Sequence, residues 1–126
     1  MDPNVKKRMF TCRALTAQSH AERIEKRQGD QAVFQAAFSG FDALPTPTLI
    51  QPAIKLSNVD EDKSPGHFTR PFKYIDMCAL SLPTAYSAEG LPTGIQIVRP
   101  AGEEGFAIKI GSALEAALGI SVRPKL

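Results

Sequence analysis

The chain has 126 residues, of which 43% are hydrophobic and 22% are charged, and its net charge is only +2. This composition is that of one ordinary globular domain, residues 1–126, and its weak charge does not favour a nucleic acid partner. No apolar run reaches the roughly 18 residues of a membrane span and no signal peptide is recognisable, so we expect a cytoplasmic protein without a membrane segment.

The charge is distributed unevenly along the chain. Residues 1–27 contain seven Lys and Arg and three acids, a net charge of +4, whereas the remainder has eight against ten, a net charge of −2. A basic segment can contact RNA phosphates. Glu22 and Lys26, however, are spaced as an i, i+4 pair on a helix, which favours a solvated helix face.

Two helices are predicted in the first third of the chain. Asp2 and Pro3 are a typical helix start, and a short helix should run to about Phe10. A longer helix should begin at Thr16 or at Ser19, since Ser19-x-x-Glu22 matches a capping box, and Gly40 should end it. The positions expected on one face of this helix are Ile24, Gln31, Phe34, Phe38 and Phe41.

A short strand and a long loop should follow. Residues 42–48 favour a strand, but Pro45 and Pro47 restrict it to a sheet edge or to a strand end at a cavity. Residues 51–66 are rich in acids and breakers. A calcium-binding loop counted from Asp60 would place Pro65 at the required glycine and Pro71 at the required bidentate glutamate, so we expect an exposed loop and no metal site.

The second half should form a helix, a β-hairpin and a final helix. Thr69 is the expected cap of the first helix, whose apolar positions are Phe72, Ile75, Met77 and Leu80. Residues 78–99 predict a hairpin that turns through Ser87–Gly90, with Gly90 at positive φ. A helix over residues 104–118 should end at Gly119, and residues 120–126 are a tail or an edge strand. The two cysteines, Cys12 and Cys78, should be reduced thiols.

These elements predict an α/β fold with about four helices and three or four short strands. A hairpin needs further strands or a covering helix to be stable. We therefore expect exposed sheet edge and core face, including Ile95, Ile97 and Val98, and self-association or a partner that covers them.

Three segments of the chain resemble the amidase signature family. They are ALSLPTAYSAEGLPTGIQIV (79–98), FDALPTPTLIQPAI (41–54) and SPGHFTRPFKYIDMCALSLP (64–83), and MDPNVKKRM is similar to an internal helix of the family. The resemblance spans nearly the whole chain but only the last quarter or so of a typical member. It implies the C-terminal piece of that fold, a partial mixed sheet whose other strands come from the preceding polypeptide.

The resemblance also implies a chemistry whose catalytic groups are not found here. Members of the family hydrolyse an amide or transfer its nitrogen with a nucleophilic serine, a second serine in a cis peptide and a lysine, from a Gly/Ser-rich segment. This sequence has no two adjacent serines and no G-x-S-x-G turn. We therefore assign no catalytic residue and no cofactor, and whether the chain is an enzyme stays open.

Substrate contact is what the resemblance can carry over. Thr46, Thr69 and Arg70 fall on family motif positions that face the pocket, where an arginine can pair with a carboxylate or a carbonyl. Loop capping and surface pairing are the alternative roles of these residues. Lys73, Asp76 and Ala85 depart from the family pattern, and Asp76 is spaced to pair with Lys73 on a helix. His20 and His67 have no second ligand nearby in sequence and are expected to be surface or packing residues.

The function expected from the sequence is therefore that of the C-terminal part of an amidase signature enzyme, inactive alone. The partners expected are the missing N-terminal amidase portion or a second copy, with a small amide substrate only after completion. The alternatives are a non-catalytic interaction module, including one component of a split amidase, and a truncated product without function.

Overall fold

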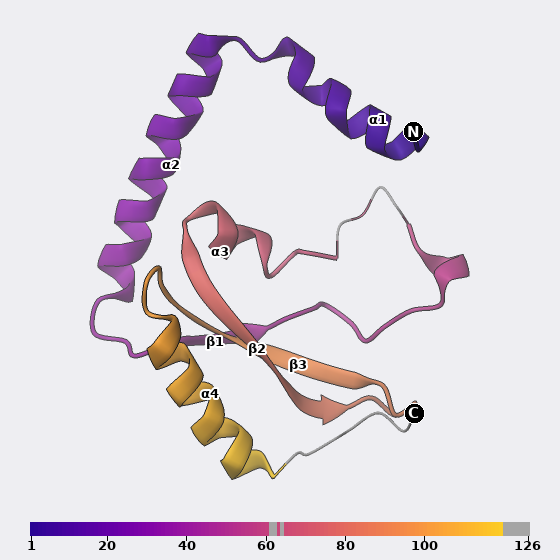
Figure 1. The fold of residues 1–126 in the computed structure, drawn as a ribbon, viewed down its shortest axis with the longest axis vertical. Coiled ribbons are helices and arrows are strands. Elements are labelled where there is room, and N and C mark those ends of the chain that lie inside the picture. The colour runs from indigo at the N-terminus through magenta and orange to yellow at the C-terminus, as the bar shows by residue number, and fades with distance from the viewer. Residues whose placement is uncertain (61–62, 64, 120–126) are drawn as a thin grey trace.

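The computed structural model describes residues 1–60, 63 and 65–119. The elements in chain order are α1 (Pro3–Phe10), η1 (Thr11–Ala14), α2 (Ala17–Phe38), β1 (Leu44–Pro47), η2 (Leu56–Asn58), α3 (Arg70–Tyr74), β2 (Met77–Tyr86), β3 (Pro92–Pro100) and α4 (Glu104–Leu118). Figure 1 shows a small sheet flanked by α3 and α4, with α1 and most of α2 extending away from it. The predicted α/β fold with a hairpin is confirmed. The expectation for residues 120–126 lies outside the described residues.

The three described strands form one antiparallel sheet in the order β1-β3-β2. β2 and β3 are the predicted hairpin, and Gly90 in its turn has φ +77°, where a side chain would be strained. Among the described strands, β1 pairs with β3 only, as the prolines of β1 require of an edge strand. Gln96 on the central strand lies directly opposite Thr46 on one side and Ser81 on the other. A polar row therefore crosses all three strands.

One face of the sheet is covered by α4. Gly111 of α4 lies so close to β2 that an added Cβ would come within 2.5 Å of Leu80 Cδ2 and 3.2 Å of Leu82 Cδ1. Ile97 on β3 is 3% exposed and Ala107 on α4 is 2% exposed. Because side chains alternate along a strand, Ala79, Ser81 and Gln96 point to the opposite face. Gly119 ends α4 in the left-handed conformation, as predicted.

The expectation that the hairpin leaves its β-branched residues uncovered is wrong for two of them. Ile97 is 3% exposed and Val98 is fully buried. The physical reason is that β1 joins the free edge of β3, α4 packs on the face of Ile97 and α3 packs beside β2, so the chain itself covers the centre of the sheet. The other edge of the described sheet is β2.

The helix starts follow the capping rules, with one alternative decided. Asp2 Oδ1 accepts from the backbone amides of Asn4 at 2.8 Å and Val5 at 3.2 Å, as predicted for α1. α2 begins after Thr16 and not after Ser19. The Thr16 hydroxyl accepts from the Ser19 amide at 3.1 Å, and the Ser19 hydroxyl accepts from the Thr16 amide at 3.0 Å. Ser19 is thus the inner member of a capping pair, so it does not form the predicted box with Glu22.

The helix predicted after Thr69 is shorter than the apolar spacing indicates. α3 ends at Tyr74, and Thr69 makes no side-chain capping bond. Asp76 has φ +62°, which turns the chain out of the helix. Met77 and Leu80 belong to β2, opposite Pro100 and Ile97. The pairing with β3 overrides the local helical spacing, because each ladder residue gains sheet hydrogen bonds and packing that the helix cannot supply.

The middle and the C-terminal half of α2 contact α3 through hydrogen bonds and an aromatic pair. Arg27 donates from Nε to the backbone oxygen of Tyr74, and the Tyr74 hydroxyl donates to Asp30 at 3.0 Å. The rings of Phe34 and Phe72 lie 6.2 Å apart in an edge-to-face arrangement. Asp76, expected to pair with Lys73, instead lies 3.9 Å from Arg27 Nη2. The turn after α3 takes Asp76 away from helical spacing, and α2 then provides the nearer cation.

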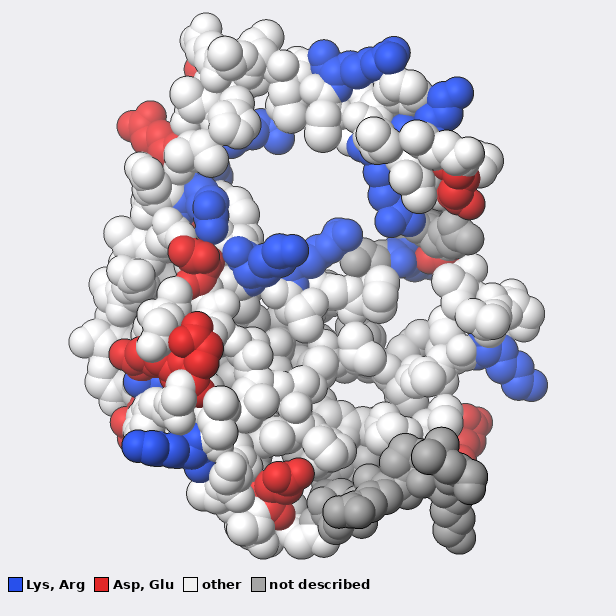
Figure 2. Space-filling model, viewed as in Figure 1, with Lys and Arg blue, Asp and Glu red and all other residues white. Residues whose placement is uncertain are grey.

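The molecule exposes much more surface than a compact domain of its mass. Its accessible area is 9770 Å², whereas a compact monomer of this mass exposes about 6,600 Å². Every residue that the structure describes in α1 and α2 is at least partly exposed. Figure 2 shows Lys and Arg gathered along these helices and around an opening between them and the rest of the molecule. None of the helices in the described part of the chain combines the length and apolar character that crossing a membrane requires.

Candidate functional site

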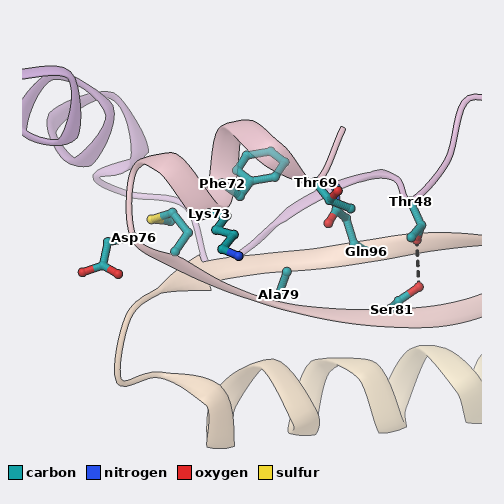
Figure 3. Close-up of a pocket in the computed structure, with 9 residues that line it drawn as sticks. Thr48, Thr69, Phe72, Lys73, Asp76, Ala79, Ser81 and Gln96 are labelled. Carbon is teal, nitrogen blue, oxygen red and sulfur yellow. Dashed lines mark hydrogen bonds between the residues drawn. The ribbon is translucent and has the colours of Figure 1, made fainter. Parts of the chain in front are cut away.

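A cavity of about 300 Å³, called the site cavity below, lies between α3 and the face of the sheet that α4 leaves free. One lining residue, Thr48, directly follows β1. The others lie on β2, on β3, on α3 or next to the ends of α3 (Figure 3). The lining residues are Thr48, Thr69, Phe72, Lys73, Asp76, Met77, Ala79, Ser81 and Gln96. The wall is mostly neutral, with hydroxyl groups at one end and charged groups at the other.

The Gln96 side chain on β3 forms hydrogen bonds to two other parts of the cavity wall, β1 and the loop before α3. It is 2% exposed, and its side-chain amide donates to Thr46 Oγ1 at 2.9 Å and to the backbone oxygen of Phe68 at 2.8 Å, with a longer contact to Pro47 O at 3.4 Å. These bonds join β3 to β1 and to the loop that precedes α3. A buried amide with two good partners fixes the geometry around it, because losing either partner would leave a polar group unsatisfied.

Two hydroxyl groups form the neutral end of the site cavity. Thr48 Oγ1 and Ser81 Oγ are 2.8 Å apart and share one hydrogen bond. They meet across β3 at Gly94, whose oxygen accepts from the Thr48 amide at 3.0 Å. An added Cβ at Gly94 would come within 2.5 Å of Leu82 O, so glycine is required there. The pair retains one hydroxyl proton and several lone pairs for a ligand.

Lys73 and Asp76 line the opposite end of the cavity. Figure 3 shows the amine of Lys73 reaching from α3 toward the sheet, while the carboxylate of Asp76 lies at the outer end. Asp76 has Arg27 of α2 as its cationic neighbour. In the part of the chain that the structure describes, Lys73 makes no ion pair and no hydrogen bond to Ser81.

The titrating groups with a shifted pKa lie beside the cavity and not in it. The hydrogen bond from Lys26 lowers the pKa of Asp30, and the bond from Tyr74 adds to this. The same ion pair raises the pKa of Lys26. Desolvation, followed by the bond to Asp30, raises the pKa of Tyr74. Burial raises the pKa of Cys78, and its thiol donates to Pro100 O at 3.3 Å, so it is not an activated nucleophile.

The structure brings two of the three predicted contact residues to the cavity region. Thr69 is half-buried and lines the cavity, and the Thr46 hydroxyl lies behind it as an acceptor for Gln96. Arg70 is exposed and is not part of the cavity lining. Their role as substrate contacts stays a prediction. Gln96 was not predicted as a site residue, although a lone amide among Ile95, Ile97 and Val98 is a detectable signal for a buried polar connection.

A second, larger groove of about 500 Å³ adjoins the site cavity. Thr48 and Ser81 line both, so their shared hydrogen bond marks the boundary between the two. The other walls of the groove are residues 47 and 49–52 after β1, residues 82–84 on β2 and residues 92–95 on β3. Most of these side chains are apolar. The hydroxyl pair therefore stands between an apolar groove and a partly charged cavity.

The histidines do not contribute to the site. The His67 ring packs edge-on against Phe68 at 4.9 Å and is not part of the cavity lining. Within residues 1–60, 63 and 65–119, no group of three or more His, Cys, Asp or Glu side chains is placed to hold a metal ion. The cavity offers hydrogen bonds and one cation to a ligand, without a described serine hydrogen-bonded to a base.

The family model described as Amidase matches residues 3–106. The chain belongs to the amidase family. The glutamyl-tRNA(Gln) amidotransferase A subunit of Rhizorhabdus wittichii is 31% identical over 133 residues, which cover 98% of this chain and 27% of that protein. The corresponding protein of Maricaulis maris is 31% identical over 96 residues, covering 73% of this chain and 20% of the relative.

The fold agrees with this assignment. A crystal structure of an amidase superposes with a TM-score of 0.81 at 32% identity, covering 94% of this chain and 29% of that one. The expected α/β fold, part of the amidase signature architecture, is thereby confirmed. The chain spans only 20% to 29% of the length of these three proteins.

Proposed function

We propose that this chain is the C-terminal, substrate-contacting part of an amidase, an enzyme that hydrolyses an amide C–N bond or transfers its nitrogen. The observation that carries the proposal is the site cavity, in which Gln96 and Ser81, with Thr46 fixed behind Gln96, border a space large enough for a small amide. The proposed substrate contacts are Thr69 from the wall, Thr46 from behind it and Arg70 from the adjoining surface. A cytoplasmic location is part of the proposal.

The catalytic groups should come from another polypeptide segment. Amide hydrolysis at neutral pH needs a nucleophile, a base within hydrogen-bond reach and donors for the oxyanion. Among the described serines, Ser81 pairs with Thr48 and Ser19 pairs with Thr16, and neither contact involves a base. The 126 residues alone should therefore be inactive, with no cofactor.

The surface supports a missing partner. The surplus over a compact monomer is about 3,000 Å², well above the roughly 800 Å² that each partner contributes to a standard interface. Much of it lies on α1, α2 and the loop after β1. The partner that fits is the N-terminal portion of an amidase, supplied by a preceding segment or by a separate chain.

The test is a complementation assay. The purified chain is mixed with the segment of the Rhizorhabdus wittichii relative that precedes its matched region, and ammonia release is measured from butyramide and from glutamine. We expect turnover in the mixture only. The control is a mixture in which this chain carries Gly94→Ala. This substitution should displace the hydroxyl pair of Thr48 and Ser81, so the turnover of the mixture should fall if the cavity is used.

The outcomes separate the candidates. Turnover by the chain alone, lost in Ser81→Ala or Lys73→Met, would show that a serine and a lysine of this cavity suffice, and the proposal would be wrong. If the two segments bind each other without turnover, the chain acts as a non-catalytic interaction module. The exposed faces of α1 and α2 favour that second candidate. If they neither bind nor react, a truncated product gains support.

A further inference from the structure

The two charged side chains that line the site cavity differ in whether they have a partner. Lys73 and Asp76 both line the cavity, but Arg27 of α2 approaches Asp76 at 3.9 Å and competes for its charge. The lining itself holds one cation, Lys73, and one carboxylate, Asp76, and Arg27 faces that carboxylate from outside the cavity. The other lining residues are neutral, so Lys73 is the charged lining residue that has no oppositely charged side chain within ion-pair distance among the described residues. An anion close to the Lys73 amine is therefore stabilised.

Lys73 is the side chain that is placed to bind an anion in the cavity. Figure 3 shows its amine directed over Ala79 toward Gln96, whereas Asp76 lies at the rim. Its four-carbon stem lets the ammonium group adjust to a ligand as a mobile point charge with three donors. In the described residues no carboxylate occupies it. A ligand carboxylate would therefore find an uncommitted partner.

The hydroxyl end of the same cavity suits an amide group. Thr48 and Ser81 share one hydrogen bond, which leaves the pair one further donor and several acceptor positions. A primary amide needs both kinds of partner, since its oxygen accepts and its nitrogen donates. A ligand with an amide at one end and an anion at the other would satisfy both ends of the cavity.

We propose that Lys73 is a specificity-determining residue and that the cavity takes a small amide carrying a carboxylate. The inference rests on the proposed function, because it assigns the substrate class of that same cavity. The volume of about 300 Å³ is at the lower limit of small-molecule sites, which favours a short ligand. The carboxylate pairs with Lys73, and the amide lies at Thr48 and Ser81.

Two isosteric probes isolate the charge. Succinamate and succinamide have the same number of heavy atoms and differ in whether one end is a carboxylate or a second amide. Binding to the full chain is measured by NMR from the shifts of the Gln96 side-chain amide and the backbone amides of Thr69 and Ser81. An exposed ion pair should make succinamate bind about threefold to fivefold more tightly than succinamide. The preference should shrink at high salt.

Three variants assign the preference to Lys73. Lys73→Gln removes the charge and should give both probes the same affinity, whereas Lys73→Arg should retain the preference. Lys109→Gln removes one exposed cation from α4, on the other side of the sheet, and is the control for a change in net charge. Circular dichroism of each variant verifies that the fold is retained.

The inference is overturned if the two probes bind the native chain equally, if the preference persists in Lys73→Gln, or if neither probe shifts a cavity resonance. The complementation assay keeps the proposed function separate. Equal kcat/KM for both probes in an active mixture would remove the role of Lys73 and leave the amidase proposal intact. Discrimination in binding with an inactive mixture would support Lys73 and count against the amidase proposal.

Discussion

Replacing Gln96 with leucine should destabilise the chain substantially, because the Gln96 side chain joins β3 to β1 and to the loop before α3. The variant loses two short hydrogen bonds, of 2.8 and 2.9 Å, and leaves Phe68 O and the Thr46 hydroxyl without that donor. At about 1 kcal/mol net for each bond, and more where a partner stays unsatisfied, the free energy of unfolding should fall by about 2–3 kcal/mol. That is a large part of the roughly 5–15 kcal/mol typical of a domain.

Urea unfolding followed by circular dichroism measures this difference. The control is Gln28→Leu, at an exposed position of α2, which should change the free energy of unfolding by less than about 0.5 kcal/mol. If Gln96→Leu matched the control at an unchanged m-value, Gln96 would not hold the cavity wall. Gln96→Glu adds a pH test. The new carboxylate would face acceptors, so stability should fall as the pH rises above about 4.3.

Two further predictions concern glycines and a carboxylate outside the cavity lining. Gly94→Ala places a Cβ 2.5 Å from Leu82 O and should lower the free energy of unfolding by about 1–3 kcal/mol. Gly29→Ala, in open space on α2, should raise it by about 0.5–1 kcal/mol. Equal effects of the two variants in urea unfolding would contradict the close approach at Gly94. Lys26→Met should raise the pKa of Asp30 toward its ordinary 3.8, measured by NMR of the carboxyl carbon. Since a lowered pKa stabilises the fold above the unfolded value and is lost as the pH falls, Lys26→Met should weaken the acid dependence of stability, and an unmoved Asp30 titration would refute this.

The sequence correctly predicted those helix ends and turns that depend on one particular residue type. Asp2 caps α1, Gly90 turns the hairpin at positive φ and Gly119 ends α4, because each position needs a residue type that few others can replace. The apolar spacing after Thr69 predicted too long a helix. Met77 and Leu80 have a period that suits a helix, but their strand pairing with β3 decides their conformation. That pairing partner lies about 20 residues later and is invisible to a local pattern.

The site was predictable only in part, because some of its contacts also join residues that are distant in sequence. Thr69 could be assigned to the pocket from its motif, and the structure does place it in the cavity lining. The connection made by Gln96 depends on Thr46 and Phe68, which lie 50 and 28 residues away in sequence. Nothing in the spacing of these residues indicates that they meet. A polar residue within a buried β-branched strand signals only that some partner must exist.

Helical periodicity predicts that one face is apolar but carries no information about what covers it. On α2, Phe34 contacts Phe72 of α3, whereas Ile24 and Val33 are 40% and 72% exposed. The chain covers its own sheet centre, since Ile97 and Val98 are buried, and leaves α1 and the first half of α2 largely exposed. Gln96 belongs to the self-covered part, and Lys73, although exposed, lies on α3 beside it. Their predicted effects should therefore be measurable in the chain alone, whereas any test that involves α1 or α2 needs the segment that packs against them.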